Sequence, residues 1–192
     1  MNAQAGQQIN AVKIVGAGLI GASIGLALAQ QGVSITIDDA DEKALALATD
    51  LLAPYLKASG EEKKEYDLVV IATPPASVIG TLKSEFLINP KSVFIDVSSV
   101  KTNLIQEIEV LPALSQSFVG THPMAGREVS GASSAQADLF NGRAWILTPT
   151  SKSSERAIAM AKQLIVALGA SSYEMTAKDH DHLMARISHL PQ

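Results

Sequence analysis

A glycine-rich turn near the N-terminus constrains the fold of this chain more than any other feature. The segment VKIVGAGLIGASIG contains the pattern G-x-G-x-x-G at Gly16, Gly18 and Gly21. The apolar run at 11–16 before the pattern is typical of a buried strand, and the stretch 19–31 after it has the spacing of a helix. A strand, a glycine turn and a helix in this order predict the first βαβ unit of a dinucleotide-binding fold.

Each glycine has a separate task in that prediction. Gly16 makes the tight turn, Gly18 lets the backbone come close to a pyrophosphate, and Gly21 lets the helix lie close to the strand. The backbone N–H groups at the start of the helix, at Leu19 and Ile20, would face the phosphates together with the positive end of the helix dipole. The alternative is a glycine turn without a ligand, but the strand–turn–helix context favours the ligand.

An acid after the second expected strand, at 33–38, bears on the choice of nucleotide. Asp38 and Asp39 are adjacent there, and an acid at this place accepts hydrogen bonds from a ribose diol and repels a 2′-phosphate. We assign this role to Asp39, because the residues after it are typical of a helix start with Asp41 as the cap. No arginine follows the acid directly, so we expect NAD rather than NADP.

The rest of the chain alternates between strand and helix patterns. Further strands are expected at 67–75, 92–100 with its exit loop, 117–122, 143–149 and 171–176, and helices at 41–50, 103–114, 154–168 and 178–190. This alternation predicts an α/β fold, a Rossmann-like, doubly wound and mainly parallel sheet with helices on both faces. We place the dinucleotide-binding domain at 11–176, after a loose arm at 1–10.

Composition excludes several classes of protein. Hydrophobic residues make up 47% and aromatic residues only 4%, which suits a core of closely packed aliphatic side chains. The formal net charge of -4 and the lack of a basic block argue against nucleic acid as a partner. No cysteine is present, so disulfides and thiolate chemistry are excluded. The polar N-terminus and the glycines that interrupt the apolar region 12–29 lead us to expect a cytoplasmic protein that does not span a membrane.

Polar side chains follow two further strands and should line the same crevice at the carboxyl edge of the sheet. Thr73 and Pro74 end one strand, and Ser98, Ser99 and Lys101 follow the next. Hydroxyl groups at this place are well positioned to contact a cofactor or a substrate. The alternative is that they only form ordinary strand exits.

His122 ends another short strand, in a run rich in Gly and Ser. An imidazole beside a nicotinamide suits the removal of a proton from a hydroxyl group while a hydride leaves the same carbon.

A second group of histidines lies near the C-terminus. His180 and His182 flank Asp181, and His189 would share a helix face with His182. No further acid or cysteine completes a tetrahedral set, so we expect no metal here. We expect instead the N-terminus of a helix with Asp179 as its cap.

Five segments, taken in order, resemble the prephenate and arogenate dehydrogenases: GAGLIGAS, DVSSVK, GTHPMAGREVSG, DLFNGRAWILTP and DHDHLMARISHLP. The resemblance covers almost the whole chain, and HPMAG and SHLP are its most specific parts. It implies an NAD-dependent enzyme of tyrosine biosynthesis with a small-molecule substrate. Such enzymes oxidise prephenate to 4-hydroxyphenylpyruvate, or arogenate to tyrosine, with release of carbon dioxide.

The resemblance also implies roles for single residues. His122 would hold the ring hydroxyl of the substrate and accept its proton, and Ser99 would hydrogen-bond the same hydroxyl. His189 would hold the ring end of the substrate. The candidates for substrate binding are His189, Glu128, Lys101 and Arg127, and those for cofactor binding are Gly16, Gly18, Leu19, Ile20, Gly21, Asp39, Thr73, Pro74 and Ser98.

Members of the family normally continue past SHLP into a helical domain that completes the substrate site and forms most of the dimer. Segment 177–192 is therefore expected to start the linker helix to such a domain, and the full-length form is expected to be a homodimer. Three alternatives stay open. They are an arogenate dehydrogenase that uses NAD or NADP, a non-catalytic module that binds NAD, and, more distantly, a 3-hydroxyacid dehydrogenase, which would share the glycine motif.

Overall fold

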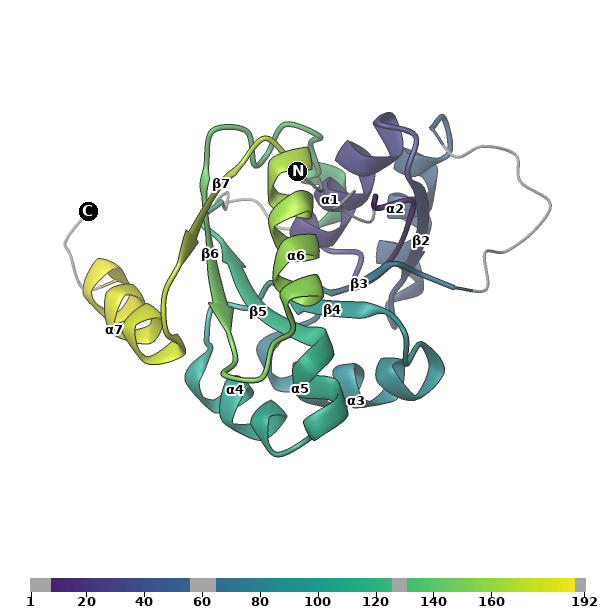
Figure 1. Ribbon diagram of the computed structural model, residues 1–192. Coiled ribbons are helices and arrows are strands. Elements are labelled where there is room, and N and C mark those ends of the chain that lie inside the picture. The colour runs from purple at the N-terminus through teal and green to yellow at the C-terminus, as the bar shows by residue number, and fades with distance from the viewer. Residues whose placement is uncertain (1–7, 56–64, 126–130, 189–192) are drawn as a thin grey trace, which may run out of the picture.

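The fold is built on one sheet of seven strands in the order β2-β1-β3-β4-β5-β6-β7 (Figure 1). The computed structural model describes residues 8–55, 65–125 and 131–188. The strands are β1 (Ala11–Val15), β2 (Ser34–Asp38), β3 (Leu68–Ile71), β4 (Val93–Asp96), β5 (Phe118–Pro123), β6 (Ala144–Pro149) and β7 (Ser171–Glu174). Neighbouring strands pair in parallel, apart from the antiparallel pair β5 and β6. The mainly parallel α/β fold predicted from the sequence is confirmed.

Helices cover both faces of the sheet. They are α1 (Leu19–Gln30), α2 (Glu42–Leu52), α3 (Val78–Ile88), α4 (Thr102–Glu109), α5 (Pro112–Ser117), α6 (Glu155–Ala167) and α7 (Ala177–Ser188), with short 3₁₀ turns η1 (Pro75–Ser77) and η2 (Ala132–Ser134). One apolar cluster joins α1, α2 and α6 to one face, and a second joins α3, α4 and α5 to the other. No helix in the described ranges is long and apolar enough to cross a membrane.

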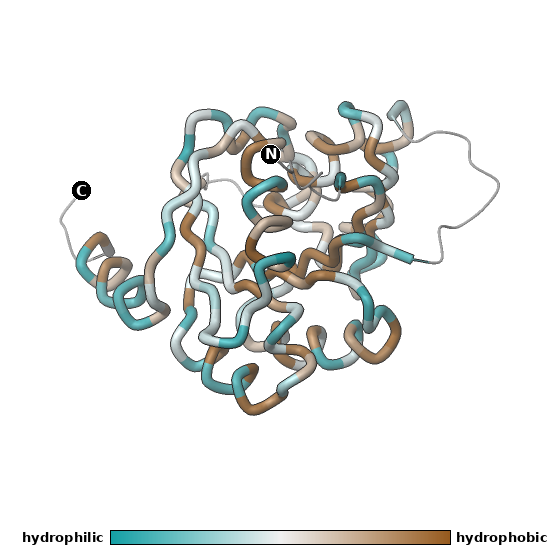
Figure 2. The backbone as a smooth tube through the Cα atoms, in the orientation of Figure 1, coloured by the Kyte–Doolittle hydropathy of each residue, from teal (hydrophilic) through white to brown (hydrophobic). Residues whose placement is uncertain are grey.

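Alternation along the central strands explains the two clusters. In β3, Leu68 and Val70 belong to one cluster while Val69 and Ile71 belong to the other. A strand that is buried on both faces must be apolar throughout, which accounts for the continuous LVVI run. Figure 2 shows hydrophobic residues along these central strands.

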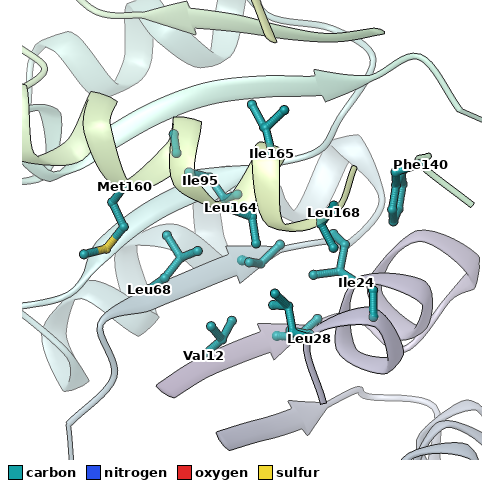
Figure 3. Close-up of a cluster of buried hydrophobic side chains, with 14 of the residues drawn as sticks. Val12, Ile24, Leu28, Leu68, Ile95, Phe140, Met160, Leu164, Ile165 and Leu168 are labelled. Carbon is teal, nitrogen blue, oxygen red and sulfur yellow. The ribbon is translucent and has the colours of Figure 1, made fainter. Parts of the chain in front are cut away.

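The first cluster is the larger one (Figure 3). Leu164 of α6 and Ile24 and Leu28 of α1 pack over Val12 and Leu68 of the sheet. This packing fixes α1 against the strand that carries the glycine turn, and so sets the position of that turn.

Three local predictions were wrong. No helix was predicted at the position of α3, and the single helix predicted at 103–114 is two separate helices, α4 and α5. Pro112 lies in the first turn of α5, and the residue before a proline is disfavoured in a helix, so Leu111 leaves the helical conformation. The cap of α7 is Thr176 rather than Asp179: Thr176 Oγ1 accepts from the N–H of Asp179 at 3.1 Å and donates to its carboxylate at 2.7 Å.

Candidate functional site

The glycine turn after β1 has the close contacts that the motif predicts. Gly16 has a φ of 112°, and a Cβ there would lie 2.4 Å from the carbonyl oxygen of Ala72. A Cβ on Gly21 would lie 1.9 Å from the carbonyl oxygen of Gly16. Neither position can hold a side chain without moving the backbone, so the turn and the close approach of α1 to β1 both require glycine.

The start of α1 is open toward the carboxyl edge of the sheet. Gly18 is the N-cap residue, it provides no side-chain cap, and a Cβ on it would meet nothing within 4 Å. The first N–H groups of a helix have no partner within the helix and attract anions. Gly18, Leu19 and Ile20 are half-buried, so the helix start is partly exposed.

The carboxylate of Asp39 lies against the glycine turn. It accepts hydrogen bonds from the N–H of Ala17 at 2.6 Å and from the N–H of Asp41 at 2.8 Å. Asp38 contributes only its backbone there, since its carbonyl oxygen accepts from the N–H of Gly16 at 2.7 Å while the residue is exposed. Of the two adjacent acids, Asp39 therefore holds its side chain at the predicted place.

The direction of the chain reverses between β1 and β3. From β1 the chain moves to β2 on one side, and from β3 it moves to β4 on the other, which opens a crevice at the carboxyl ends of these strands. Thr73 follows β3 there, and its buried hydroxyl has no hydrogen-bond partner within the described part of the chain. A buried hydroxyl without a partner is unfavourable. This hydroxyl, the open helix start and the acid fit a bound dinucleotide. Pro74, beside Thr73, is exposed.

A buried polar network lies at the end of β4. Lys101 Nζ donates to Asp96 Oδ2 at 2.5 Å, and both side chains are fully buried. Ser98 Oγ donates to the same carboxylate, whose other oxygen accepts from the N–H of Thr121 at 3.2 Å. Burial lowers the pKa of Lys101, and the charge of Asp96 opposes this effect.

This network gives Ser98 and Lys101 different surroundings from those expected. Both side chains point to Asp96 inside the protein, so the geometry does not support their expected contacts with a cofactor and a substrate. Ser99, in contrast, is exposed at the edge.

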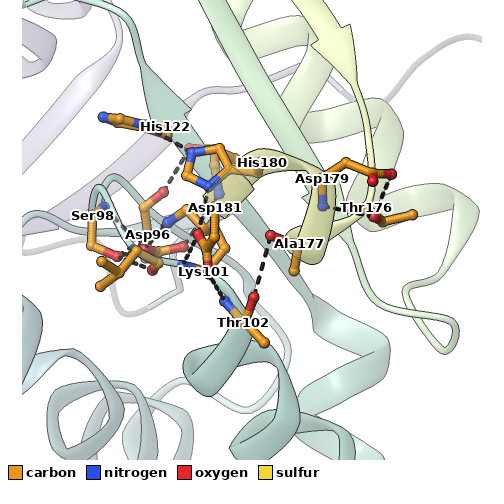
Figure 4. A network of polar contacts seen from close by, with 12 residues as sticks. Asp96, Ser98, Lys101, Thr102, His122, Thr176, Ala177, Asp179, His180 and Asp181 are labelled. Carbon is orange, nitrogen blue, oxygen red and sulfur yellow. Dashed lines mark hydrogen bonds and ion pairs between the residues drawn. The ribbon is translucent and has the colours of Figure 1, made fainter. Parts of the chain in front are cut away.

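His122 lies one residue before the end of β5, on the same edge of the sheet as the glycine turn. Its Nδ1 lies 2.9 Å from Nε2 of His180, which comes from the first turns of α7 (Figure 4). His180 is fully buried, and its Nδ1 lies 2.8 Å from Oδ1 of Asp181. Three side chains thus form a row, Asp181–His180–His122. His122 is half-buried, and its Nε2 has no hydrogen-bond partner within the described part of the chain.

Asp181 also joins α7 to the start of α4. Its carboxylate accepts from the N–H of Lys101 at 3.0 Å and from the N–H of Thr102 at 2.8 Å. Burial raises the pKa of Asp181, but hydrogen bonds from Thr102, His180 and Lys101 outweigh burial and lower the pKa to about 2. Asp181 is therefore ionised at neutral pH.

The pKa of His122 is low. Burial, the ammonium group of Lys101 and the ring of His180 lower it to about 4, and Asp96 and Asp181 only partly oppose them. At neutral pH His122 is therefore a neutral imidazole, able to accept a proton but not to donate one as an imidazolium.

Sequence reasoning did not identify His180 and Asp181 as part of the site. The only signal was the D-H-D-H run in an otherwise ordinary helix start. Arg127, Glu128 and His189, the remaining candidates, lie outside the described residues. Within the residues that the structure covers, no group of three or more His, Cys, Asp and Glu side chains is arranged to hold a metal ion.

Comparison with known proteins identifies the family. The family model for the prephenate dehydrogenase nucleotide-binding domain matches residues 24–174. A probable prephenate dehydrogenase of Streptomyces niveus is 36% identical over 180 residues, which are 93% of this chain and 49% of the relative. The prephenate dehydrogenase of Bacillus subtilis (strain 168) is 34% identical, with 96% of this chain and 52% of the relative covered. The chain thus spans about half the length of these relatives.

Solved structures of the same family also resemble this chain. A prephenate dehydrogenase from Aquifex aeolicus has a TM-score of 0.81 and 28% identity, over 93% of this chain and 66% of that one. The same enzyme in complex with hydroxyphenyl propionate and NAD+ has a TM-score of 0.79 and 26% identity, over 92% and 63%. An arogenate dehydrogenase from Synechocystis has a TM-score of 0.77 and 27% identity, over 93% and 64%. The chain belongs to the prephenate dehydrogenase family, and the matched region is the nucleotide-binding domain of that family.

Proposed function

We propose that this chain is the nucleotide-binding part of an NAD-dependent prephenate dehydrogenase, which oxidises and decarboxylates prephenate to 4-hydroxyphenylpyruvate. One observation carries the proposal: a neutral imidazole, His122, lies near the end of β5 on the same edge of the sheet as the glycine turn, with Nε2 free of protein partners in the described residues. Oxidation of a ring hydroxyl needs such an acceptor for the hydroxyl proton.

The residues of the site would bind the cofactor or take part in the reaction, each group with its own role. The glycine turn and the start of α1 would hold the pyrophosphate, and Asp39 would accept hydrogen bonds from the ribose diol. Bound NAD would supply the acceptor for the hydride that leaves the ring carbon. His122 Nε2 takes the hydroxyl proton, and Ser99 hydrogen-bonds the same oxygen. The bond to the ring carboxylate then breaks, carbon dioxide leaves, and its electron pair completes the aromatic ring.

We propose NAD rather than NADP because of Asp39. Hydrogen bonds from Ala17 and Asp41 fix this carboxylate beside the glycine turn. A negative charge there repels a 2′-phosphate. The solved relative from Aquifex aeolicus that is described in complex with NAD+ supports the same choice.

Arogenate is the second candidate substrate. The solved relative from Synechocystis is described as an arogenate dehydrogenase, and it resembles this chain nearly as closely as the Aquifex aeolicus enzyme does. Prephenate and arogenate differ only at the side chain, where one has a keto group and the other an amino group. The comparison of both substrates is therefore part of the test.

The test is the formation of NADH or NADPH by this chain, with prephenate and arogenate offered in parallel with NAD and NADP. We expect turnover with prephenate and NAD. His122→Asn should lower kcat by about 10²- to 10⁴-fold and leave NAD binding unchanged, because the variant loses only the proton acceptor. His182→Asn, a change of the exposed histidine on α7, is the matched control.

Two results would contradict the proposal. Full turnover by His122→Asn would exclude His122 as the proton acceptor. Failure of the chain to bind NAD would exclude a nucleotide-binding part, whereas NAD binding without turnover would mean that the chain carries only the cofactor half of the site.

A further inference from the structure

The first turns of α7 place a histidine inside the protein. Thr176 caps the helix, and His180 follows it, with its ring fully buried between His122 and Asp181 (Figure 4). The rings of His122 and His180 meet edge to face, with centroids 5.1 Å apart. A buried imidazole with both nitrogens engaged is fixed in rotation, so the hydrogen-bond directions in the row can be assigned.

The assignment starts at Asp181. Its carboxylate is ionised and accepts the N–H groups of Lys101 and Thr102, so it can only accept from His180 as well. His180 Nδ1 is therefore the donor. In a neutral His180 the other nitrogen, Nε2, then carries the lone pair and accepts.

The same logic continues to His122. Because His180 Nε2 accepts, the nitrogen 2.9 Å away, Nδ1 of His122, must donate. We propose that His180 and Asp181 are positioning residues that hold His122 in its Nδ1–H tautomer and keep the Nε2 lone pair directed to the substrate hydroxyl. The proposal deepens the function given above and rests on it for the identity of the substrate, although the tautomer itself can be measured without turnover.

The charges around the row support this arrangement. Lys101 and His180 disfavour a positive charge on His122, while Asp96 and Asp181 favour it. When His122 Nε2 takes a proton, its Nδ1–H still donates to His180, and the Asp181 carboxylate lies at the far end of the row. The row thus orients the acceptor before the reaction, the Asp181 carboxylate partly offsets the charge of the imidazolium after it, and the proton stays on His122.

The first experiment is NMR of the imidazole nitrogens in the chain labelled with ¹⁵N-histidine. A pH of about 8 is suitable, because the ordinary histidine pKa is about 6.5. We expect His122 to show a protonated Nδ1 and an unprotonated Nε2. A neutral imidazole in water prefers the opposite tautomer, so the signal is diagnostic. A protonated Nε2 on His122 would overturn the proposal.

Two variants separate positioning from simple packing. His180→Gln keeps an amide oxygen to accept from His122 and an amide N–H to donate to Asp181, whereas His180→Leu fills the space without either. We expect the tautomer to persist in the glutamine variant and to be lost in the leucine variant. In turnover, kcat should fall at least tenfold with leucine and recover with glutamine, with KM for NAD unchanged. His182→Leu, on the exposed side of α7, is the control.

The possible results of these experiments distinguish a failure of the inference from a failure of the proposed function. Retention of the tautomer in a folded His180→Leu variant would overturn the proposal, and if that variant does not fold, the wild-type tautomer and the glutamine variant decide. The expected tautomer in a chain that does not bind NAD would contradict the proposed function and leave the inference intact. Turnover with His122 in the opposite tautomer would overturn the inference alone.

Discussion

His122 should make the stability of this protein depend on pH in a defined window. Its pKa is about 4 in the native state, against an ordinary value of 6.5 for an unfolded chain. Between these values the unfolded chain binds a proton that the native protein does not. The free energy of unfolding should therefore fall as the pH drops from about 6.5 to about 4. Asp181, with a native pKa of about 2 and an ordinary value of 3.8, acts mainly below this window and begins to contribute near its acidic end.

Chemical denaturation at several pH values in this window measures the effect. His122→Gln has no group that titrates at this position, so its stability should decrease less on acidification than that of the wild type. Identical pH profiles for the two proteins would mean that His122 is protonated as easily in the native state as in the unfolded chain.

At the same scale, the sequence predicted residues whose role is encoded in a sequence motif. Gly16 and Gly21 were assigned correctly as turn and close-contact glycines, because the spacing of the motif identifies them even though Gly16 approaches Ala72, which is distant in the sequence. His180 was missed, because its partner His122 lies on β5, and only the docking of α7 on α4 brings the two rings together. The inward direction of Lys101 was missed for a related reason: a lysine after a strand is usually exposed, and only the buried Asp96 draws it inside.

The contact between α1 and β1 is the most demanding one between elements. Gly21→Ala would force a methyl group into the carbonyl of Gly16, so we expect α1 to shift and the protein to lose several kcal/mol, roughly the size of other severe core substitutions. Gly18→Ala meets open space in the protein and should fold normally, yet weaken NAD binding because its methyl group occupies the path of the pyrophosphate.

Thermal unfolding and NAD titration of both variants separate the two effects. A Gly18→Ala variant that binds NAD as tightly as the wild type would show that the pyrophosphate does not approach the backbone at this residue.

Elements were predictable where burial leaves a regular pattern. The central strands are apolar throughout because both faces are covered, and α6 has a clear apolar side. The helix α3 was missed because its start follows two prolines and the short turn η1, which resemble a strand exit. The antiparallel direction of β6 relative to β5 could not be predicted either, since strand direction depends on the path of the long connection from β5.

At the scale of the whole molecule, NAD should stabilise the chain. A ligand that binds only the native state adds about 2.7 kcal/mol at a concentration of 100 Kd. For a chain of this size that corresponds to a rise in Tm of roughly 5–10 °C. Asp39→Asn should reduce the rise with NAD and increase it with NADP, because the charge that repels a 2′-phosphate is gone. Asp38→Asn, which changes only an exposed side chain, should behave as the wild type does.

Differential scanning fluorimetry with each nucleotide provides the measurement, with each variant compared to its own ligand-free Tm. An equal rise with NAD and NADP in the wild type would mean that Asp39 does not select the nucleotide.

The buried pair of Lys101 and Asp96 has a consequence for engineering this protein. Replacing a buried ion pair by apolar side chains of similar volume is often neutral or stabilising, whereas removing one partner costs about 3–5 kcal/mol. A directed-evolution screen that rewards heat resistance alone would thus favour clones in which both charges are gone. Such clones would also lose the ammonium group that adds to the effect of burial in lowering the pKa of His122, and the carboxylate that accepts from Thr121 and Ser98. Selection for heat resistance would remove both charged side chains, whereas selection for turnover would keep them.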